Sequence, residues 1–532
     1  MLKILKSKYF SLFFLLFVIL LFTKIDFRIQ TDITCCSDDF DYFIHAETIA
    51  EDFDFDYTNQ LEGFENKRFN KVKTAPKGFL GSGLLASPFL FIGNIFDQIF
   101  GSVSNNHVNF KILFYSFSAY FYFIASSYFL FKSLRYIGFE ITASKTLLFI
   151  SGSGVIYYFF ERYSMTHVYE VFAASLIIYF SAKFYKSNSD LFAFLIPAAV
   201  FIGFEIKWIH YYFIFLPLLI KHILKSKNNL FHNKFFISSM LLFTALHFYF
   251  SKLIYGVLTI NPHYVHYNTE NTEVQDLLSE GFLSLSFYIK NIKNVFVHFY
   301  TQEFGLIYFQ PIIFIIIFGS MSYFLYCLVK KENLIIAALF FLLSWQEFAI
   351  SLIWTSPGSA YAYRYLMNLA PLGVLFLCYL YKNYDIKYLD SYLIFFSFFS
   401  IISVLFFETT EFTQLSLEPT INAFGDLSRY TQRYYLSGLF KSFIAIESYL
   451  KIFTTSFLGM FFFKILVFFL TPEGLNSYLE LLGLPISNEK FQLLLIELNE
   501  TTAVYFLISS LLCLLFAFSI FRFLNIQNSV DK

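Results

Sequence analysis

Charged side chains are scarce in this sequence and make up 14% of its 532 residues, against 57% hydrophobic and 23% aromatic residues. A soluble domain of this length needs more charge on its surface, so a soluble protein is excluded. The 38 basic residues balance the 38 acidic ones, and this zero net charge indicates neither a nucleic-acid partner nor an acidic one. The composition therefore predicts an all-α, polytopic membrane protein.

Motifs for cofactors and metals are also missing. The sequence has no HExxH, CxxC, P-loop or GxGxxG, so nucleotide hydrolysis is not indicated and any energy must come from the substrate. Asp39 and Asp41 have a DxD-like spacing, which is common in acidic loops. No cofactor is predicted, although a divalent metal stays possible. Of the five cysteines, only the adjacent Cys35 and Cys36 could be redox-active, because the others lie in apolar runs.

Apolar segments recur along the chain, and about 11 to 13 of them are expected to span the membrane, since one span needs about 20 residues. The segment 9–23 follows basic residues and lacks a cleavage site, so we interpret it as a retained anchor. No fixed-period repeat divides the chain. We expect a transmembrane catalytic domain over 1–407 and a C-terminal transmembrane region over 408–532. The other expected spans are 109–131, 145–160, 168–183, 190–205, 208–221, 235–255, 304–328, 334–354, 365–381, 389–407, 451–470 and 502–524.

Lysine and arginine concentrate in alternate loops, and this bias predicts which loops lie inside. With the N-terminus inside, the inner loops carry most of the basic residues, such as Lys183, Lys186, Lys330 and Lys331. The functional loops are therefore expected to face the outer side of the membrane. The expected outward loops are 24–108, 161–167, 205–210, 256–303, 355–364 and 408–450.

The segment 79–96 would change this alternation of inner and outer loops if it crossed the membrane. FLGSGLLASPFLFIGNIF, residues 79–96, is uncharged and long enough to cross, and a crossing would move every later loop to the other side. Its Gly-Ser-Gly and Ser-Pro sequences, together with the charge bias, favour two short helices that lie at the membrane interface.

The first outward loop contains the stretch SDDFDYFIHAETIAED, which has a helical pattern from Asp38 to about Asp52. Ser37 stands where a helix N-cap is expected, and the apolar face of this helix could rest on the membrane. Asp38 and Asp39 then project from the first turn, where the helix dipole favours ionised carboxylates. A positioned carboxylate can act as a general base, although acidic residues in a first turn often only cap the helix. The following EDFDFD is expected to be solvated.

Three short outward loops add further candidates. FFERYSMTHVYE holds Glu161, Arg162 and His167, which a local ion pair and a solvated helix end explain equally well. FEIKWIHYY holds Lys207 and His210, where anchoring at the membrane interface is the simpler interpretation. The last candidate is Arg364, which breaks the positive-inside pattern and could bind a phosphate through two parallel hydrogen bonds. General contact with lipid headgroups explains it as well.

Taken together, these motifs resemble the GT-C superfamily of integral-membrane glycosyltransferases, and in particular its bacterial members related to protein mannosyltransferases. The resemblance rests on the order of SDDFDYFIHA, KGFLGSGLLASPF, ERYSMTHVYE and YRYLMNLAP. It implies transfer of a sugar, with inversion, from a polyprenyl-phosphate-type lipid to a glycan, lipid or protein acceptor on the outer side of the membrane. Metal use varies in this family. The roles that the resemblance implies are a general base at Asp38 or Asp39, stabilisation of the phosphate by Arg364 with Lys207 or Arg162, and orientation of hydroxyls by Glu161 or His167, with Tyr42 and His210 as further binding candidates.

Two other readings stay open. A glycan polymerase or ligase also uses lipid-linked sugars on the outer side, but typically through a large loop rich in arginine, and 256–303 holds only Lys290 and Lys293. A transporter or flippase predicts ionisable residues in the middle of the membrane and repeated halves. The candidate residues here lie at the ends of spans.

Overall fold

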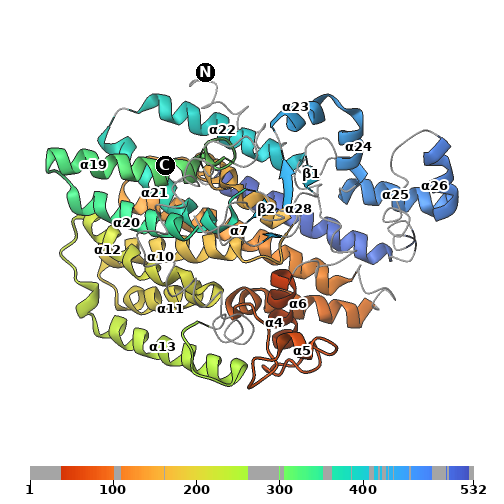
Figure 1. Cartoon of the computed structure of the whole chain (residues 1–532), viewed down its shortest axis with the longest axis horizontal. Helices are drawn as coiled ribbons and strands as arrows, with labels where there is room; N and C mark the ends of the chain where they lie inside the picture. The colour runs from red at the N-terminus through yellow and green to blue at the C-terminus, as the bar shows by residue number, and fades with distance from the viewer. Residues whose placement is uncertain are drawn as a thin grey trace.

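The computed structural model is a bundle of helices, most of which run side by side (Figure 1). The only strands in the described part are two short antiparallel pairs, β1 (Thr413–Ser416) with β4 (Thr431–Tyr434) and β2 (Thr420–Ile421) with β3 (Leu427–Ser428). The expected all-α class is confirmed. The structure describes residues 37–100, 109–160, 162–261, 305–351, 362–384, 386–406, Phe299 and shorter stretches between 413 and 525.

Eight helical segments of the described chain are long and apolar enough to cross a membrane, so the chain is a polytopic membrane protein. The expected anchor at 9–23 and the adjacent Cys35 and Cys36 lie outside the described residues. The eight segments are α6 (Leu80–Phe100), α7 (Phe110–Ile137), α10 (His167–Ser187), α13 (Lys234–Tyr255), Pro311–Lys330, Arg364–Asn383, most of α22 (Lys387–Leu405) and α28 (Ala503–Asn525).

Some expected spans are interrupted or joined from shorter pieces. The run Pro311–Lys330 consists of α18 (Pro311–Phe314), η5 (Ile315–Gly319) and α19 (Ser320–Lys330), and Arg364–Asn383 consists of η6 (Arg364–Leu369) and α21 (Ala370–Asn383). The remaining described elements are α4 (Ser37–Glu51), α5 (Glu65–Arg68), α8 (Ala143–Ile150), η1 (Ser151–Val155), α9 (Ile156–Phe160), α11 (Asp190–Ile206), η2 (Trp208–Phe215), α12 (Leu216–Leu224), η3 (Leu230–His232), α17 (Leu306–Phe309), α20 (Leu334–Ser351), α23 (Leu436–Ile444), α24 (Ile446–Thr454), α25 (Phe457–Leu470) and α26 (Pro472–Leu481).

The segment expected to span continuously over 145–160 is broken in its middle. Gly154 has φ 88°, a left-handed conformation that favours glycine, and it separates α8 from α9. Gly152 faces α22, where an added Cβ would come within 2.5 Å of the Ser397 side chain. The Ser-Gly-Ser-Gly sequence thus allows both the break in the helix and its close contact with α22. The apolar pattern of the sequence predicted neither feature.

Helices α7 and α10 have the relative direction that the charges of the loops predict. Near one end, the Ser118 and Tyr169 hydroxyls are 2.7 Å apart, and near the other end Lys183 donates to the Tyr136 hydroxyl. The two helices therefore run in the same direction, and α8, η1 and α9 return the chain between them. His167 and Lys183 consequently lie toward opposite ends of α10, which separates the polar candidates from the basic inner loop.

The segment 79–96 forms one continuous helix, α6, so the expected pair of short helices is wrong. Its Gly-Ser-Gly sequence provides close contacts instead of a break. A Cβ on Gly81 would come within 2.4 Å of the Ile206 amide nitrogen, and one on Gly93 would come within 2.6 Å of the Phe110 carbonyl oxygen. Ile206 ends α11 and Phe110 begins α7, and both lie at the end of the bundle that carries His167. Helix α6 runs antiparallel to the first half of α7, since Phe96 contacts Phe110 and Phe89 contacts Phe121.

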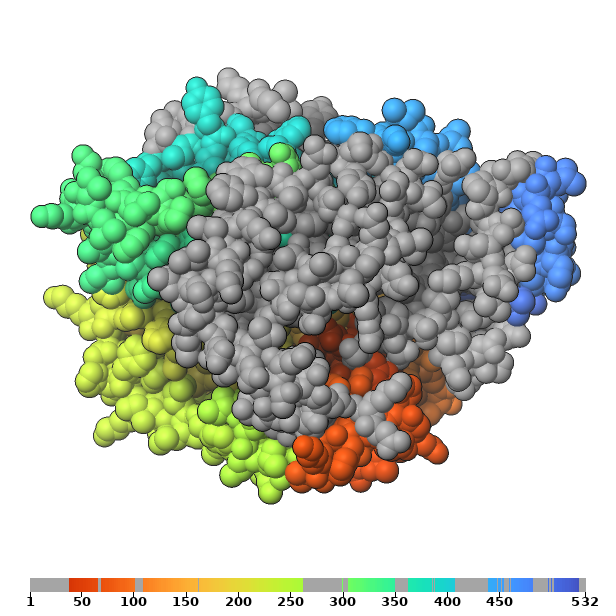
Figure 2. Space-filling model, in the orientation of Figure 1, coloured from red at the N-terminus to blue at the C-terminus, as the bar shows by residue number. Residues whose placement is uncertain are grey.

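Helix α4 packs inside the protein, under α6 and α7. Of the apolar side chains expected to rest on the membrane, Phe43, Ala46 and Ala50 are buried in the main core, whereas Phe53 is exposed. The Phe43 ring lies against Tyr115 of α7. That expectation is wrong because α6 supplies the apolar partner surface. The following acidic residues 51–56 are mostly exposed, as expected. Figure 2 shows this part of the chain at the lower surface, in orange-red, beside the yellow-green α13.

The C-terminal helix α28 packs along α7. Tyr505, Phe516 and Phe523 contact Phe110, Tyr120 and Phe131 in turn. The span expected over 451–470 is instead divided between α24 and α25.

Candidate active site

Helix α4 presents three aspartates near its start, and each meets an arginine from a different part of the chain. Two of these arginines were candidates from the sequence, whereas Arg68 was not. Such pairs connect α4 to three other segments at the outward end predicted from the loop charges. The pairs are Asp38 with Arg364 (Oδ2 to Nη2, 3.5 Å), Asp39 with Arg162, and Asp41 with Arg68 (Oδ1 to Nε, 2.8 Å).

The two aspartates that competed for the role of base lie in different surroundings. Asp39 is buried, where it is paired with Arg162 and accepts a hydrogen bond of 2.8 Å from the Ser164 hydroxyl. The Asp38 side chain is 46% exposed. A general base must be reachable by the hydroxyl it deprotonates. Of the two carboxylates, Asp38 is therefore the one that an outside hydroxyl could reach, whereas Asp39 is held by Arg162 and Ser164.

Asp41 is a second buried anchor of the first loop. Burial raises the pKa of its carboxyl to about 6, although the neighbouring Arg68 guanidinium lowers it. Tyr42, next along the helix, is buried as well. Burial and then the carboxylates of Asp38 and Glu170 raise the pKa of the Tyr42 hydroxyl. Tyr42 therefore keeps its proton at neutral pH.

Two cations flank the ring of Tyr365. The Arg364 guanidinium lies 5.0 Å from the ring centroid and donates a 3.0 Å hydrogen bond to the Tyr365 hydroxyl. The Lys207 ammonium lies 4.7 Å from the same centroid. These contacts hold two positive charges against one ring, and Arg364 is the one that also contacts Asp38. An anionic group beside Tyr365 could bind both cations.

A buried glutamine fixes the backbone that leads into Arg364. The Gln310 side chain accepts a 2.8 Å hydrogen bond from the Tyr363 amide and donates to the Tyr363 carbonyl at 3.3 Å. It also donates a 2.8 Å bond to the carbonyl of Ser153, in the break between α8 and α9. Because the helix is broken there, the Ser153 carbonyl is free to accept this bond, and Gln310 thereby connects the break to the start of η6.

Glu170 lies on the other side of Lys207, in the first turn of α10. Its Oε1 is 3.8 Å from the Lys207 ammonium and 3.3 Å from His167 Nδ1, and it accepts a hydrogen bond from the Thr166 hydroxyl. Its Oε2 is 3.6 Å from His210 Nε2. Glu170 is fully buried, so these groups compensate its charge in a region of low dielectric.

Asn368 connects this group to a second buried carboxylate. Its Nδ2 lies 3.0 Å from His210 Nδ1, 3.0 Å from Glu347 Oε1 and 2.9 Å from the Tyr212 hydroxyl.

Three residues of this group were not candidates from the sequence, namely Glu170, Glu347 and Asn368. Glu347 could have been found, because it is the only acidic residue in the apolar run of α20, and a carboxylate inside a span indicates function.

The structure brings most of the predicted site residues to one place. Glu161 lies outside the described residues. In the part of the chain that the structure describes, no group of three or more His, Cys, Asp or Glu side chains is arranged to hold a metal ion. The predicted residues that converge are Asp38, Asp39, Tyr42, Arg162, His167, Lys207, His210 and Arg364.

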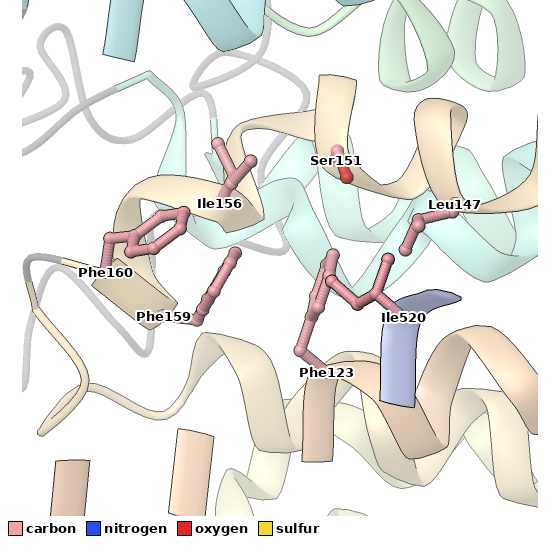
Figure 3. A pocket seen from close by; sticks show the side chains of 7 residues that line it. All are labelled: Phe123, Leu147, Ser151, Ile156, Phe159, Phe160 and Ile520. Carbon is pink, nitrogen blue, oxygen red and sulfur yellow. The ribbon is translucent and has the colours of Figure 1, made fainter. Parts of the chain in front are cut away.

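A small apolar cavity lies elsewhere in the bundle (Figure 3). Side chains of α7, α8, η1, α9 and α28 line it, among them Phe123, Phe159 and Ile520. Ser151 is its single polar residue, and none of the converging site residues reaches it. This cavity offers no groups for catalysis.

Comparisons with protein-family models, with curated proteins and with solved structures found no match to this chain. The resemblance to GT-C enzymes stays a prediction from the sequence motifs.

Proposed function

We propose that this protein is a glycosyltransferase that moves a sugar from a polyprenyl-phosphate-type lipid to an acceptor hydroxyl at the outer face of a bacterial inner membrane. The observation that carries the proposal is the approach of Asp38 to Arg364, 3.5 Å apart, with Lys207 and Arg364 both against the ring of Tyr365. A carboxylate beside two cations is what this reaction requires, because a proton leaves the acceptor while negative charge develops on a phosphate.

In the proposed reaction the acceptor oxygen attacks the anomeric carbon of the sugar. A carbon–oxygen bond forms there, and the bond between that carbon and the phosphate oxygen breaks. The electron pair of the broken bond stays on the lipid phosphate, and the acceptor proton passes to Asp38. The attack comes from the side opposite the phosphate, so the anomeric configuration is inverted.

Arg364 would exchange partners when the donor binds. In the described structure it contacts Asp38 and the Tyr365 hydroxyl. A phosphate offers its planar guanidinium a stronger, bidentate partner, and Lys207 adds a second positive charge. Arg364 would then bind the phosphate, and the Asp38 carboxylate would accept the proton. The two cations stabilise charge that grows in the transition state, a contribution to catalysis that is often large.

Arg364→Gln tests the proposal in membranes that contain the full chain, supplied with a panel of polyprenyl-phosphoryl sugars. We expect sugar transfer to fall by about 100-fold or more, as for loss of a transition-state donor. Arg522→Gln is the matched control, because Arg522 is exposed in the last turn of α28. Transfer by Arg364→Gln at the unsubstituted rate contradicts the proposal, and so does movement of the lipid-linked sugar across the membrane without any transfer.

A further inference from the structure

A connected chain of buried polar side chains leads away from Lys207 and ends in the bundle at α20. It consists of His167, Glu170, His210, Asn368 and Glu347, and we call these five residues the buried polar chain. Each is at most 2% exposed. Four different elements contribute to it, namely α10, η2, η6 and α20. The cation–phosphate chemistry proposed above does not use these residues.

Each member of the buried polar chain has a polar atom that makes no hydrogen bond within the structure. These atoms are both ring nitrogens of His167, Glu170 Oε2, His210 Nε2, Asn368 Oδ1 and Glu347 Oε2. Buried polar atoms are nearly always hydrogen-bonded in native proteins, and leaving one unpaired destabilises the fold. A cluster of this kind therefore points to a polar ligand.

The contacts constrain which of these atoms donate and which accept. Asn368 Nδ2 must donate to Glu347 Oε1, so the Asn368 Oδ1 atom is an acceptor. The same amide nitrogen carries two hydrogens and also donates to the Tyr212 hydroxyl, so the role of His210 Nδ1, 3.0 Å away, depends on the ring tautomer. The 3.6 Å from His210 Nε2 to Glu170 Oε2 is too long for a good hydrogen bond. A ligand hydroxyl that bridges these two atoms can donate to the carboxylate and, where Nε2 carries the ring proton, accept from it.

Several of the unpaired atoms are acceptors. Asn368 Oδ1 and Glu170 Oε2 need a donor from the ligand, and Glu347 Oε2 needs a hydrogen-bond partner. Hydroxyl groups can both donate and accept, whereas a ligand carboxylate provides only acceptors and would meet the buried Glu170 carboxylate. The chemistry that fits is a neutral ring with several free hydroxyls.

We propose that the buried polar chain is the binding site for the sugar ring of the donor and that it selects neutral sugars over uronic acids. This inference rests on the function proposed above. Lys207 connects the two regions, because its ammonium is 3.8 Å from Glu170 and 4.7 Å from the Tyr365 ring that also binds Arg364. A sugar phosphate with its phosphate on Arg364 and Lys207 thus places its ring toward Glu170.

The test measures the affinity that the sugar adds to the lipid phosphate. Purified full-length protein in lipid nanodiscs is titrated with polyprenyl phosphate, polyprenyl-phosphoryl glucose, mannose and galactose, and polyprenyl-phosphoryl glucuronic acid. We expect at least one neutral sugar to tighten binding by about tenfold over the bare lipid phosphate, which corresponds to about 1.4 kcal/mol. The lipid that carries the uronic acid should bind no more tightly than the bare lipid phosphate, in the wild type and in every variant. Glu347→Gln and Glu347→Met are expected to abolish this gain and to leave the affinity for polyprenyl phosphate unchanged.

Gln346→Ala is the matched control, because Gln346 is adjacent on α20 and contacts Tyr211 outside the buried polar chain. Unchanged binding of polyprenyl phosphate shows that the variants are folded. A sugar gain that persists in both Glu347 variants, or no gain for any neutral sugar, overturns the sugar site while the proposed phosphate site stands. If polyprenyl phosphate itself binds equally well to wild type and to Arg364→Gln, it is the proposed function that fails.

Discussion

The Asp38 carboxylate and the Arg364 guanidinium approach to 3.5 Å, and they bring the first described helix to the turn that begins α21. With 46% of the Asp38 side chain exposed, such a pair contributes at most about 1 kcal/mol to stability. A structural need for this contact is therefore weak, and the proposed function gives the contact a role in catalysis. The neighbouring pair of Asp39 and Arg162 is buried, and we expect it to matter for stability.

Asp39→Asn should destabilise the fold. It leaves the buried Arg162 without its carboxylate partner, and breaking a buried pair costs about 3–5 kcal/mol. The midpoint of thermal unfolding in detergent is expected to drop clearly, and Asp39→Asn with Arg162→Met should recover much of the loss. Asp38→Asn serves as the comparison and should shift the midpoint little. An equal shift for both aspartates would contradict the division of roles.

Gln310 is expected to act as a positioning residue for Arg364. Gln310→Leu removes the hydrogen bonds that hold Tyr363 and Ser153, so Arg364 loses its fixed approach to the phosphate. Small displacements of catalytic groups can cost up to about 100-fold in rate, and we expect a loss of about tenfold or more in kcat with a smaller change in KM for the donor. Gln310→Glu keeps the acceptor for the Tyr363 amide and should retain more activity than Gln310→Leu.

A change in folding stability without any change in kcat would mean that Gln310 has only a structural role. Gln346→Leu provides a control for the loss of a glutamine side chain in the same part of the protein, since Gln346 bonds to Tyr211 and not to the η6 backbone.

His45 should make stability depend on pH. Its ring contacts the Tyr57 hydroxyl at 2.7 Å and the Gly78 carbonyl at 3.1 Å, and burial lowers its pKa from 6.5 to about 4. The folded state therefore prefers the neutral ring. The resulting stabilisation is present above pH 6.5 and is lost as pH falls from there through about 4.

Between about pH 7.5 and about pH 5, the wild type should lose about 2 kcal/mol relative to His45→Gln. Gln can accept and donate at this position but does not titrate, so it isolates the contribution of the ring. Unfolding midpoints of the two proteins at both pH values provide the measurement, and parallel changes would show that His45 is not the titrating group.

Much of the site could be predicted from types of residues and their places at the ends of spans. The helix from Asp38, the convergence of Arg162, Lys207 and Arg364, and the alternation of α7 to α10 all follow from local patterns. The sequence could not decide between Asp38 and Asp39, because the difference arises from Arg162 and Ser164, far along the chain. Local patterns say nothing of which distant partner covers a given carboxylate.

The failures have a common cause in contacts between distant segments. The glycines in the segment 79–96 looked like helix breakers, whereas Gly81 and Gly93 allow α6 to pack closely on the ends of α11 and α7. Phe43 looked like a membrane-facing residue because α6 was not yet known to cover it. Glu347 was not predicted as a site residue because it lies inside an apolar run, although a carboxylate in such a run is itself an indication of function.

The most direct test of the central claim compares Asp38→Asn with Glu62→Gln in sugar transfer from a polyprenyl-phosphoryl donor, using the full chain in membranes. Glu62 is an exposed carboxylate of the same loop, so its loss controls for the change in charge. We predict that Asp38→Asn binds the donor but transfers sugar at least about 100-fold more slowly, while Glu62→Gln retains full activity. Transfer by Asp38→Asn at the rate of the wild type would contradict the account.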